Sequence, residues 1–323
     1  MSDVQAFFAA CLLKPELLTA ACALVLVPPL AWLVVRALAP TIHAMESDRA
    51  WQAPLAAFAA TLPALLFVAI GLVTVRDAWG SPCLNYLTGR ILYAGIAAVT
   101  VFGLFRATIQ LHRRWAEVRR LLALTRPASP LLASLKATRE RTARELDSDE
   151  AFILLAGIVD PVVIVSSEAL RRLDGDQLEA AIRHEIAHAR RGDQIISAIV
   201  SFIADIVPLP VGGLVALYRR AREFAADAHA VRHVDPVDLA GALIALARGG
   251  ASLAGTAAFA EPGTVRGRLA ILLDDAPTVS SRWRRVFVTG VLCTTFVLGA
   301  SPSIAAFASG VHCLTPTLDR RMK

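Results

Sequence analysis

Residues 183–193, with the sequence RHEIAHARRGD, place two histidines four positions apart and a glutamate directly after the first. On a helix, residues four apart share a face, so His184 and His188 can direct two imidazole nitrogens at one point about 2.0–2.1 Å from each. Glu185 is then placed to act on the metal's water rather than to bind the metal. Zinc lowers the pKa of such a water to about 7, and a nearby carboxylate can take its proton during attack on a carbonyl carbon. The pattern predicts a hydrolytic zinc site with Glu185 as its catalytic base.

A catalytic zinc site needs a third protein ligand and one open position. The downstream candidates are Asp193, Asp205, Glu223, Asp227, His229 and His233. Glu223 and Asp227 stand four apart in the stretch EFAAD, so on one helix face one carboxylate can bind zinc while the other accepts the second N–H of a histidine. Both could instead pair with neighbouring arginines. Because the histidine motif lies upstream, we favour Glu223 as the ligand.

The remaining candidates have simpler explanations. Asp193 directly follows Gly192, which is expected to end the zinc helix, so Asp193 is expected to cap the next helix. Asp205 lies within an apolar run. His229 and His233 are expected to be ordinary polar residues, although either could help to stabilise an oxyanion.

Short elements of both types are predicted around the motif. Asp176 with Glu179 three residues later resembles a capping box and predicts the start of the zinc helix. Two β-rich runs, 152–155 and 162–165, predict short strands. The charged stretch 131–146 predicts a surface helix.

The composition indicates a membrane protein. Of the 323 residues, 56% are hydrophobic, whereas soluble domains average about 45–50%. Four apolar stretches are long enough, or nearly so, to cross a bilayer: 18–35, 53–75, 91–105 and 286–308. The third extends to residue 111 only if Arg106 snorkels toward the membrane surface. From the third span, 111–123 continues as a charged helical stalk.

The distribution of Lys and Arg predicts the orientation. Most of the 33 basic residues lie between Arg106 and Arg285, which places this segment in the cytoplasm. In a bacterial inner membrane, both chain termini and the loop 76–90 would then be extracytoplasmic. The net charge of +6 is therefore explained mainly by the membrane topology. Basic and aromatic residues do not alternate in a way that would suggest a nucleic-acid partner.

The same topology predicts a disulfide. Cys83 and Cys313 both fall on the outer side, where disulfides form. We therefore expect a Cys83–Cys313 bridge, for which Cys11 could compete. Cys22 and Cys293 lie within spans.

A fifth apolar run, 195–218, is long enough to cross the membrane. A crossing would put Glu223 on the opposite side from His184 and His188, although ligands of one zinc must lie within about 2.3 Å of it. Prolines and paired glycines inside the run permit a sharp bend. We expect the segment to bend and return, either as a re-entrant segment or at the inner membrane surface.

The motifs resemble those of the BlaR/MecR-type membrane metallopeptidases, and are similar to the HtpX and prenyl-protease group. HEIAHARRGD is followed about thirty residues later by AREFAAD, and GIVDPVV at 157–163 fits the family's upstream G-x-x-x-P-x-I segment. The resemblance covers about residues 151–231, and three spans before the catalytic domain with one after it fit the same plan. Both groups are gluzincins, which implies one zinc on His184, His188 and Glu223, with Asp227 behind a histidine.

The resemblance implies a membrane zinc endopeptidase that acts in regulated proteolysis, on a repressor or on itself. Ser309–Lys323 stand where these receptors carry a penicillin-binding sensor, so direct β-lactam sensing is not expected. One alternative is HtpX-like quality control of membrane proteins. Another is a membrane transducer with a structural metal site, against which the intact Glu185 argues. The sequence leaves the oligomeric state open.

The expected fold is a mainly α integral membrane protein with about four spans. A cytoplasmic α+β zinc-peptidase domain is inserted between spans three and four. The expected divisions are a three-span region at 1–110, the peptidase domain at 111–285 with its bent segment 195–218, and the fourth span with a short tail at 286–323.

Overall fold

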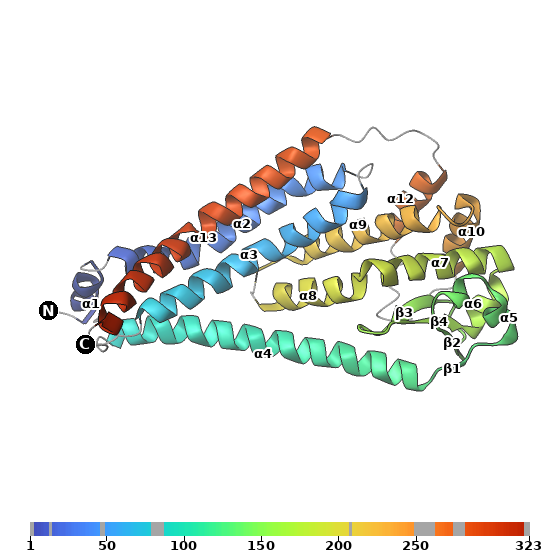
Figure 1. The fold of residues 1–323 in the computed structure, drawn as a ribbon, viewed down its shortest axis with the longest axis horizontal. Helices are drawn as coiled ribbons and strands as arrows, with labels where there is room; N and C mark the ends of the chain where they lie inside the picture. The colour runs from blue at the N-terminus through green and yellow to red at the C-terminus, as the bar shows by residue number, and fades with distance from the viewer. Residues whose placement is uncertain are drawn as a thin grey trace.

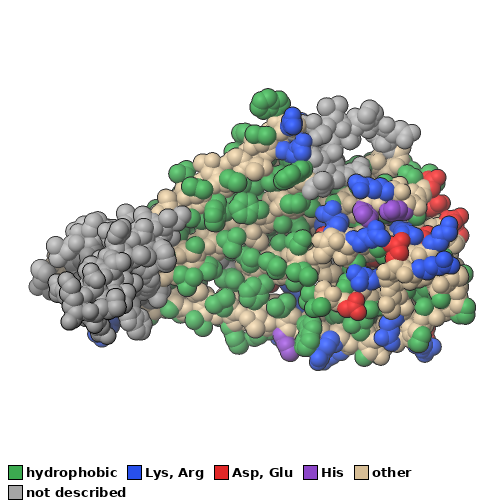
Figure 2. Space-filling view, viewed as in Figure 1, with side chains coloured by type: hydrophobic (Ala, Val, Ile, Leu, Met, Phe, Trp, Pro, Cys, Tyr) green, Lys and Arg blue, Asp and Glu red, His purple; other side chains and the backbone are tan. Residues whose placement is uncertain are grey.

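The computed structural model describes residues 3–12, 15–45, 49–78, 87–206, 209–248, 262–273 and 282–319. Within them the chain is mainly helical, with one small mixed sheet. Four long apolar helices dominate: α2 (Pro15–His43), α3 (Arg49–Ala78), α4 (Leu87–Ala123) and α13 (Arg282–Asp319). They converge at the end of the molecule where α1 (Asp3–Leu12) lies, and the sheet occupies the other end (Figure 1). Hydrophobic side chains cover the helical part and charged ones gather around the sheet end (Figure 2).

Each of the four helices contains a stretch long and apolar enough to span a membrane: Cys22–His43, Trp51–Val73, Ala94–Ala123 and Arg282–Ser301. Together with the mixed sheet placed between the third and fourth of them, this confirms the predicted fold class. Helices α2, α3 and α13 share one apolar core. Helix α4 lies outside this core and packs on α8, but only 11% of its apolar window is buried, so most of its surface is available to lipid or to a cavity.

The sheet has the strand order β1-β2-β4-β3, which leaves β3 at a free edge. Its strands are β1 (Arg126–Pro127), β2 (Ala143–Leu146), β3 (Ile153–Ala156) and β4 (Val162–Ser166). Strand β2 runs parallel to β4, and β3 runs antiparallel to it. The two predicted strands, β3 and β4, are confirmed.

The surface helix predicted at 131–146 is wrong. This stretch forms α5 (Pro130–Ser134), a 3₁₀ turn (Ala137–Arg139) and strand β2. Pairing with β4 buries Ala143 and Leu146, and this tertiary pairing overrides the local helical preference of the segment.

Helix α7 (Gly175–Arg191) carries the histidine motif and follows the short helix α6 (Ser167–Arg172). Its N-cap is Asp174, whose carboxylate accepts a hydrogen bond from the Gln177 N–H at 2.8 Å, so the predicted cap at Asp176 is wrong by two residues. Glu179 accepts a hydrogen bond from the Ala137 N–H instead of closing a capping box. Gly192 ends the helix with φ 66°, as the sequence predicts.

Helices α8 (Asp193–Ile206) and α9 (Gly212–Ala230) form a hairpin. The chain turns after α8, and α9 returns beside α8 and α7 (Figure 1). The turn lies among the long apolar helices, since Trp32 Nε1 of α2 donates to the Pro210 carbonyl at 3.3 Å. Ile206 is buried together with Ala64 of α3 and Ala107 of α4.

Arg106 hydrogen-bonds a backbone carbonyl at the C-terminal end of α8. Its Nε and Nη2 donate to the Asp205 carbonyl at 3.1 and 2.5 Å, and Arg114 Nη2 donates to the Asp205 carboxylate at 3.3 Å. Carbonyls in the last turn of a helix have no intrahelical partner, and leaving them bare in an apolar surrounding is costly. Arg106 therefore turns toward α8 rather than along α4 to the membrane surface.

Two further helices complete the peptidase end. Helix α10 (Pro236–Arg248) packs on α7, and α12 (Pro262–Leu273) packs on α10 and α9. The predicted Cys83–Cys313 bridge cannot be placed here, because residue 83 and the side chain at 313 lie outside the described residues.

The contact between α4 and α8 generates the first prediction. A Cβ atom on Gly103 would lie 1.9 Å from the Ile206 carbonyl oxygen. Gly103→Ala should therefore separate the two helices and destabilise the protein by about 1–3 kcal/mol, as overpacking does. Thermal unfolding in detergent should show a lower Tm. The matched control is Gly95→Ala on the same helix, where a Cβ meets nothing within 4 Å. It should leave the Tm unchanged or raise it, and equal Tm values for both variants would contradict the contact.

Candidate metal centre

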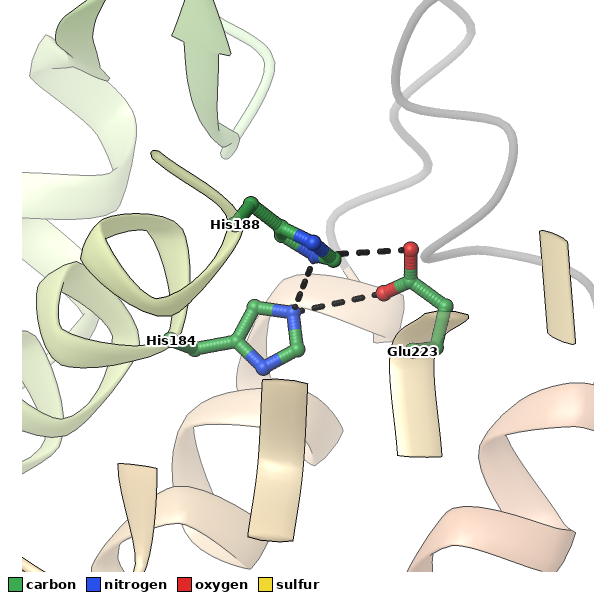
Figure 3. Close-up of side chains that lie close together, drawn as sticks. All are labelled: His184, His188 and Glu223. Carbon is green, nitrogen blue, oxygen red and sulfur yellow. Dashed lines mark hydrogen bonds and ion pairs between the residues drawn. The ribbon is translucent and has the colours of Figure 1, made fainter. Parts of the chain in front are cut away.

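Two histidines from α7 and one glutamate from α9 converge at a single point. His184 Nε2 lies 3.1 Å from His188 Nε2 and 3.3 Å from Glu223 Oε2, and His188 Nε2 lies 3.5 Å from Glu223 Oε1. The three side chains face one another across the gap between the two helices (Figure 3). Atoms bound tetrahedrally to one ion at about 2.0–2.1 Å lie about 3.3–3.4 Å apart. The observed spacing therefore fits a zinc ion at their centre.

The group is inside the protein. His184, His188 and Glu223 are at most 3% exposed, and each offers one possible ligand atom within 4.8 Å of those of the other two. Burying a carboxylate and two imidazoles is unfavourable unless other groups compensate their polarity. Two nitrogens and one oxygen are a donor set that suits zinc.

A carboxylate holds the outer nitrogen of each histidine. Asp227 Oδ1 lies 2.8 Å from His184 Nδ1, and Asp193 Oδ2 lies 2.7 Å from His188 Nδ1. Each contact favours the tautomer in which Nδ1 carries the proton and Nε2 presents a lone pair toward the shared point. The capping role predicted for Asp193 is wrong: α8 begins at Asp193 itself, and the Gly192 carbonyl accepts from its first turn.

Arg268 of α12 anchors this arrangement from behind. Its side chain is fully buried, and its guanidinium donates to both oxygens of Asp227, at 2.6 and 2.7 Å. The same guanidinium lies 3.4 Å from Glu223 Oε2. Arg268 thus links a candidate ligand with the carboxylate that orients His184. Spacing along the sequence does not identify it, since 41 residues separate it from Asp227 and it is one of two arginines in an otherwise apolar helix.

The electrostatics keep the carboxylates ionised. Burial disfavours the charged form of Asp227, but Arg268 and His184 outweigh it and lower its pKa to about 2. Burial likewise opposes ionisation of Glu223, yet the two histidines and Arg222 hold its pKa well below the usual range. Burial also opposes protonation of His188, but Glu223 and Asp193 raise its pKa to about 9. A metal ion would have to displace a proton from His188, so acid should weaken binding.

Glu185 sits beside the cluster without belonging to it. It is 3% exposed, and burial raises its pKa against the opposing influence of His188 and His184. Among the described residues, none donates a hydrogen bond to its Oε1 atom. A buried carboxylate with a raised pKa and one unsatisfied oxygen suits a group that accepts and returns a proton.

A cavity of about 1440 Å³ reaches the cluster. Glu185, His188 and Glu223 line it, together with residues of α2, α4, α8 and α9 and the free-edge strand β3. Leu154, Leu155 and Ala156 of β3 border the same space. The cavity therefore joins the candidate metal centre to an edge strand that pairs with no further strand among the described residues, although its Leu155 carbonyl accepts a hydrogen bond from Gln194 Nε2 at 3.2 Å.

The other candidates from the sequence lie elsewhere. Asp205 pairs with Arg114 at the far end of α8. The His229 and His233 rings lie 5.7 Å apart, and neither lines the cavity. Asp193 is close, but it contacts His188 Nδ1 and not the point where the three donors meet.

Comparison with known proteins identifies the central part of the chain. A family model described as BlaR1 peptidase M56 matches residues 83–239, which agrees with the resemblance seen in the motifs. The matched range contains all three donors, Glu185 and Asp227, but ends before Arg268. No curated protein and no solved structure matches the chain.

The Arg268 contacts lead to the second prediction. Arg268→Gln leaves Asp227 without its buried cation, and Glu223 keeps only Arg222, so the change should cost about 3–5 kcal/mol of stability. It should also weaken zinc binding about 10–100-fold, because the support of His184 is lost. Thermal unfolding and zinc titration against a chelator measure the two effects. Arg268→Lys keeps the charge and should restore part of the affinity.

The matched control is Arg266→Gln, an exposed arginine on the same helix. It should change neither stability nor affinity. Normal zinc affinity in the Arg268→Gln protein would show that Arg268 does not support the metal centre.

Proposed function

Residues 83–239 belong to the BlaR1 peptidase M56 family, and from this premise we propose that the protein is a zinc endopeptidase of a bacterial inner membrane. The observation that carries the proposal is the buried group of His184, His188 and Glu223 beside Glu185 on a cavity wall. In this proposal the group holds one zinc ion per chain, Asp227 orients His184, and Glu185 is the general base.

The surrounding residues suit peptide hydrolysis. Bound zinc would polarise the peptide carbonyl and lower the pKa of a water to about 7. Glu185 is placed to take a proton from the attacking water and pass it to the leaving amine, and its raised pKa favours both transfers. Asp227 and Asp193 hold the two imidazoles in place while this happens.

The free edge of β3 supports a peptide as the substrate. Unpaired N–H and C=O groups of an edge strand can pair with an extended chain, which then becomes an additional strand. Because β3 borders the cavity that Glu185 lines, such a chain would pass the candidate metal centre. This route binds the substrate through its backbone, so side-chain preferences must come from other parts of the wall.

A purely structural metal site is less compatible with this geometry. Structural zinc sites are closed by four protein ligands. Here a cavity reaches the cluster, and Glu185 stands in it with an unsatisfied oxygen. No observation in the described residues favours the HtpX-like quality-control alternative.

The proposed topology follows the positive-inside rule. Residues 1–110 and 286–323 form the membrane part, and 111–285 form a cytoplasmic peptidase domain, with both chain termini outside. The α8–α9 turn contacts Trp32 and Ala64, which lie within candidate spans, so we take the bent segment 195–218 as re-entrant. A site at this depth suits substrates near the membrane, either a repressor brought to its surface or a segment of the protein itself.

The third prediction tests the catalytic assignment. Glu185→Gln removes the base but no ligand, so it should retain one zinc per chain and lose at least ~10²-fold in peptide hydrolysis. Glu223→Gln should lose zinc affinity as well as activity. Metal analysis and peptide cleavage in detergent give both readouts. Asp176→Asn, at the exposed start of the same helix, is the control and should behave as wild type. Wild-type cleavage by Glu185→Gln would refute the mechanism.

The fourth prediction tests the topology. With the five native cysteines replaced by serine, single cysteines at positions 120, 219 and 309 can be labelled with a membrane-impermeant maleimide. In intact cells whose outer membrane is permeabilised, position 309 should react, and positions 120 and 219 should react only after lysis. Reaction at 219 without reaction at 120 would put Glu223 on the wrong side for zinc binding.

A further inference from the structure

Arginines dominate the charged wall of the cavity. Six arginines line it: Arg113, Arg114, Arg119, Arg219, Arg220 and Arg222. The carboxylates on the same wall are Glu117, Glu185 and Glu223, of which Glu223 belongs to the candidate metal centre and Glu185 lies beside it. The space that a substrate would fill therefore carries an excess of positive charge, which a bound zinc ion would increase.

Part of this charge is not neutralised within the chain. Among the described residues, neither Arg113 nor Arg119 forms an ion pair with a carboxylate. Many arginines elsewhere in the peptidase end are paired: Arg171 and Arg172 with Glu168, and Arg183 with Glu140 and Glu179. The uncompensated charge therefore gathers where α4 faces the cavity.

The wall also fixes where this charge lies. The Arg119 guanidinium stacks over the Trp115 ring, 4.0 Å from its centroid, and this contact favours one position of the arginine side chain. Arg219 and Arg220 lie on the opposite wall, on α9, so positive charge borders the cavity from two helices. Apolar side chains lie between the charged ones: Leu111, Val118, Leu121, Leu122, Leu154 and Leu217.

We propose that this cavity selects an acidic substrate, an extended peptide segment with Asp or Glu side chains flanking the bond to be cleaved. The inference rests on the proposed peptidase function and adds a substrate class to it. Backbone pairing along β3 would leave the flanking side chains to meet the wall, where the charges of Arg113 and Arg119 are complementary to carboxylates. Charges at the rim of a site act mainly on encounter and salt dependence, so the preference should appear in KM rather than in kcat.

Anionic lipid headgroups share this chemistry, since arginines near a membrane surface also bind phosphates. A peptide is favoured because the same wall contains Glu185, His188 and the edge strand β3, which a lipid headgroup would not use. Lipid binding is therefore treated as the competing outcome of the experiment.

The test compares two fluorogenic peptides of equal length in neutral detergent, one with Asp and Glu flanking the cleaved bond and one with Asn and Gln. The zinc-loaded wild type should cleave the acidic peptide with about tenfold higher kcat/KM, mainly through KM, and added salt should reduce the difference. Arg113→Gln combined with Arg119→Gln should remove most of the preference. The control variant combines Arg120→Gln with Arg139→Gln, which removes the same charge from exposed positions that do not line the cavity. This control should retain the preference for the acidic peptide.

Equal kcat/KM for the two peptides, or equal effects of the two double variants, would overturn the proposal. The proposal would also fail if Arg113→Gln combined with Arg119→Gln abolished binding to phosphatidylglycerol vesicles but kept the preference for the acidic peptide. The two arginines would then bind lipid headgroups and not the substrate. Peptide binding to Glu185→Gln, measured by fluorescence anisotropy, separates this inference from the proposed function. Tighter binding of the acidic peptide without cleavage by wild type would support the selection of acidic segments and reject the peptidase function.

Discussion

Three donor atoms must meet within about 3.3–3.4 Å if they are to hold one zinc ion, and this convergence constrains the rest of the fold. Two donors come from one helix and need no particular chain topology to meet, because positions four apart share a helix face. The third, Glu223, lies 39 residues after His184, beyond an apolar segment long enough to cross a membrane. The chain can bring Glu223 beside the two histidines only by reversing direction inside that segment. The α8–α9 hairpin is this reversal, and its tip is tied to α2 and α4 by Trp32 and Arg106.

The centre is also a balance of buried charges. Glu223, Asp227 and Asp193 are each at most 2% exposed, and each lies against at least one cation or imidazole. Buried ions are tolerated only when such partners are present, since desolvation of each one is unfavourable by several kcal/mol. The partners come from α7, α9 and α12. The site therefore forms only when these helices pack together, and its polar contacts in turn specify how they pack.

The sequence predicts the local parts of this site well. The histidine pair, Glu185 and the pair Glu223 and Asp227 follow from helical spacing, and the spans follow from hydropathy. Contacts that depend on tertiary packing were missed. Strand β2 forms in a segment with a helical pattern because it pairs with β4. The Asp193 carboxylate contacts the His188 imidazole instead of capping the backbone of the next helix. Nothing in the spacing of Arg268 indicates that α12 brings it to Asp227, since that contact depends on how α10 and α12 pack.

The position of Arg268 bears on how much of this chain forms an independent unit. The segment that matches the family contains every candidate donor, the proposed base and both carboxylates that contact the histidines, so by sequence it looks self-sufficient. The cation that neutralises Asp227 and faces Glu223 lies beyond it, on α12, which is the last helix before α13 in the described part of the chain. A shortened protein ending after α10 would keep the complete motif but bury two carboxylates without that cation. The segment that carries the recognisable motif is therefore shorter than the cooperative folding unit. Excising that segment alone would not yield an independently folding protein.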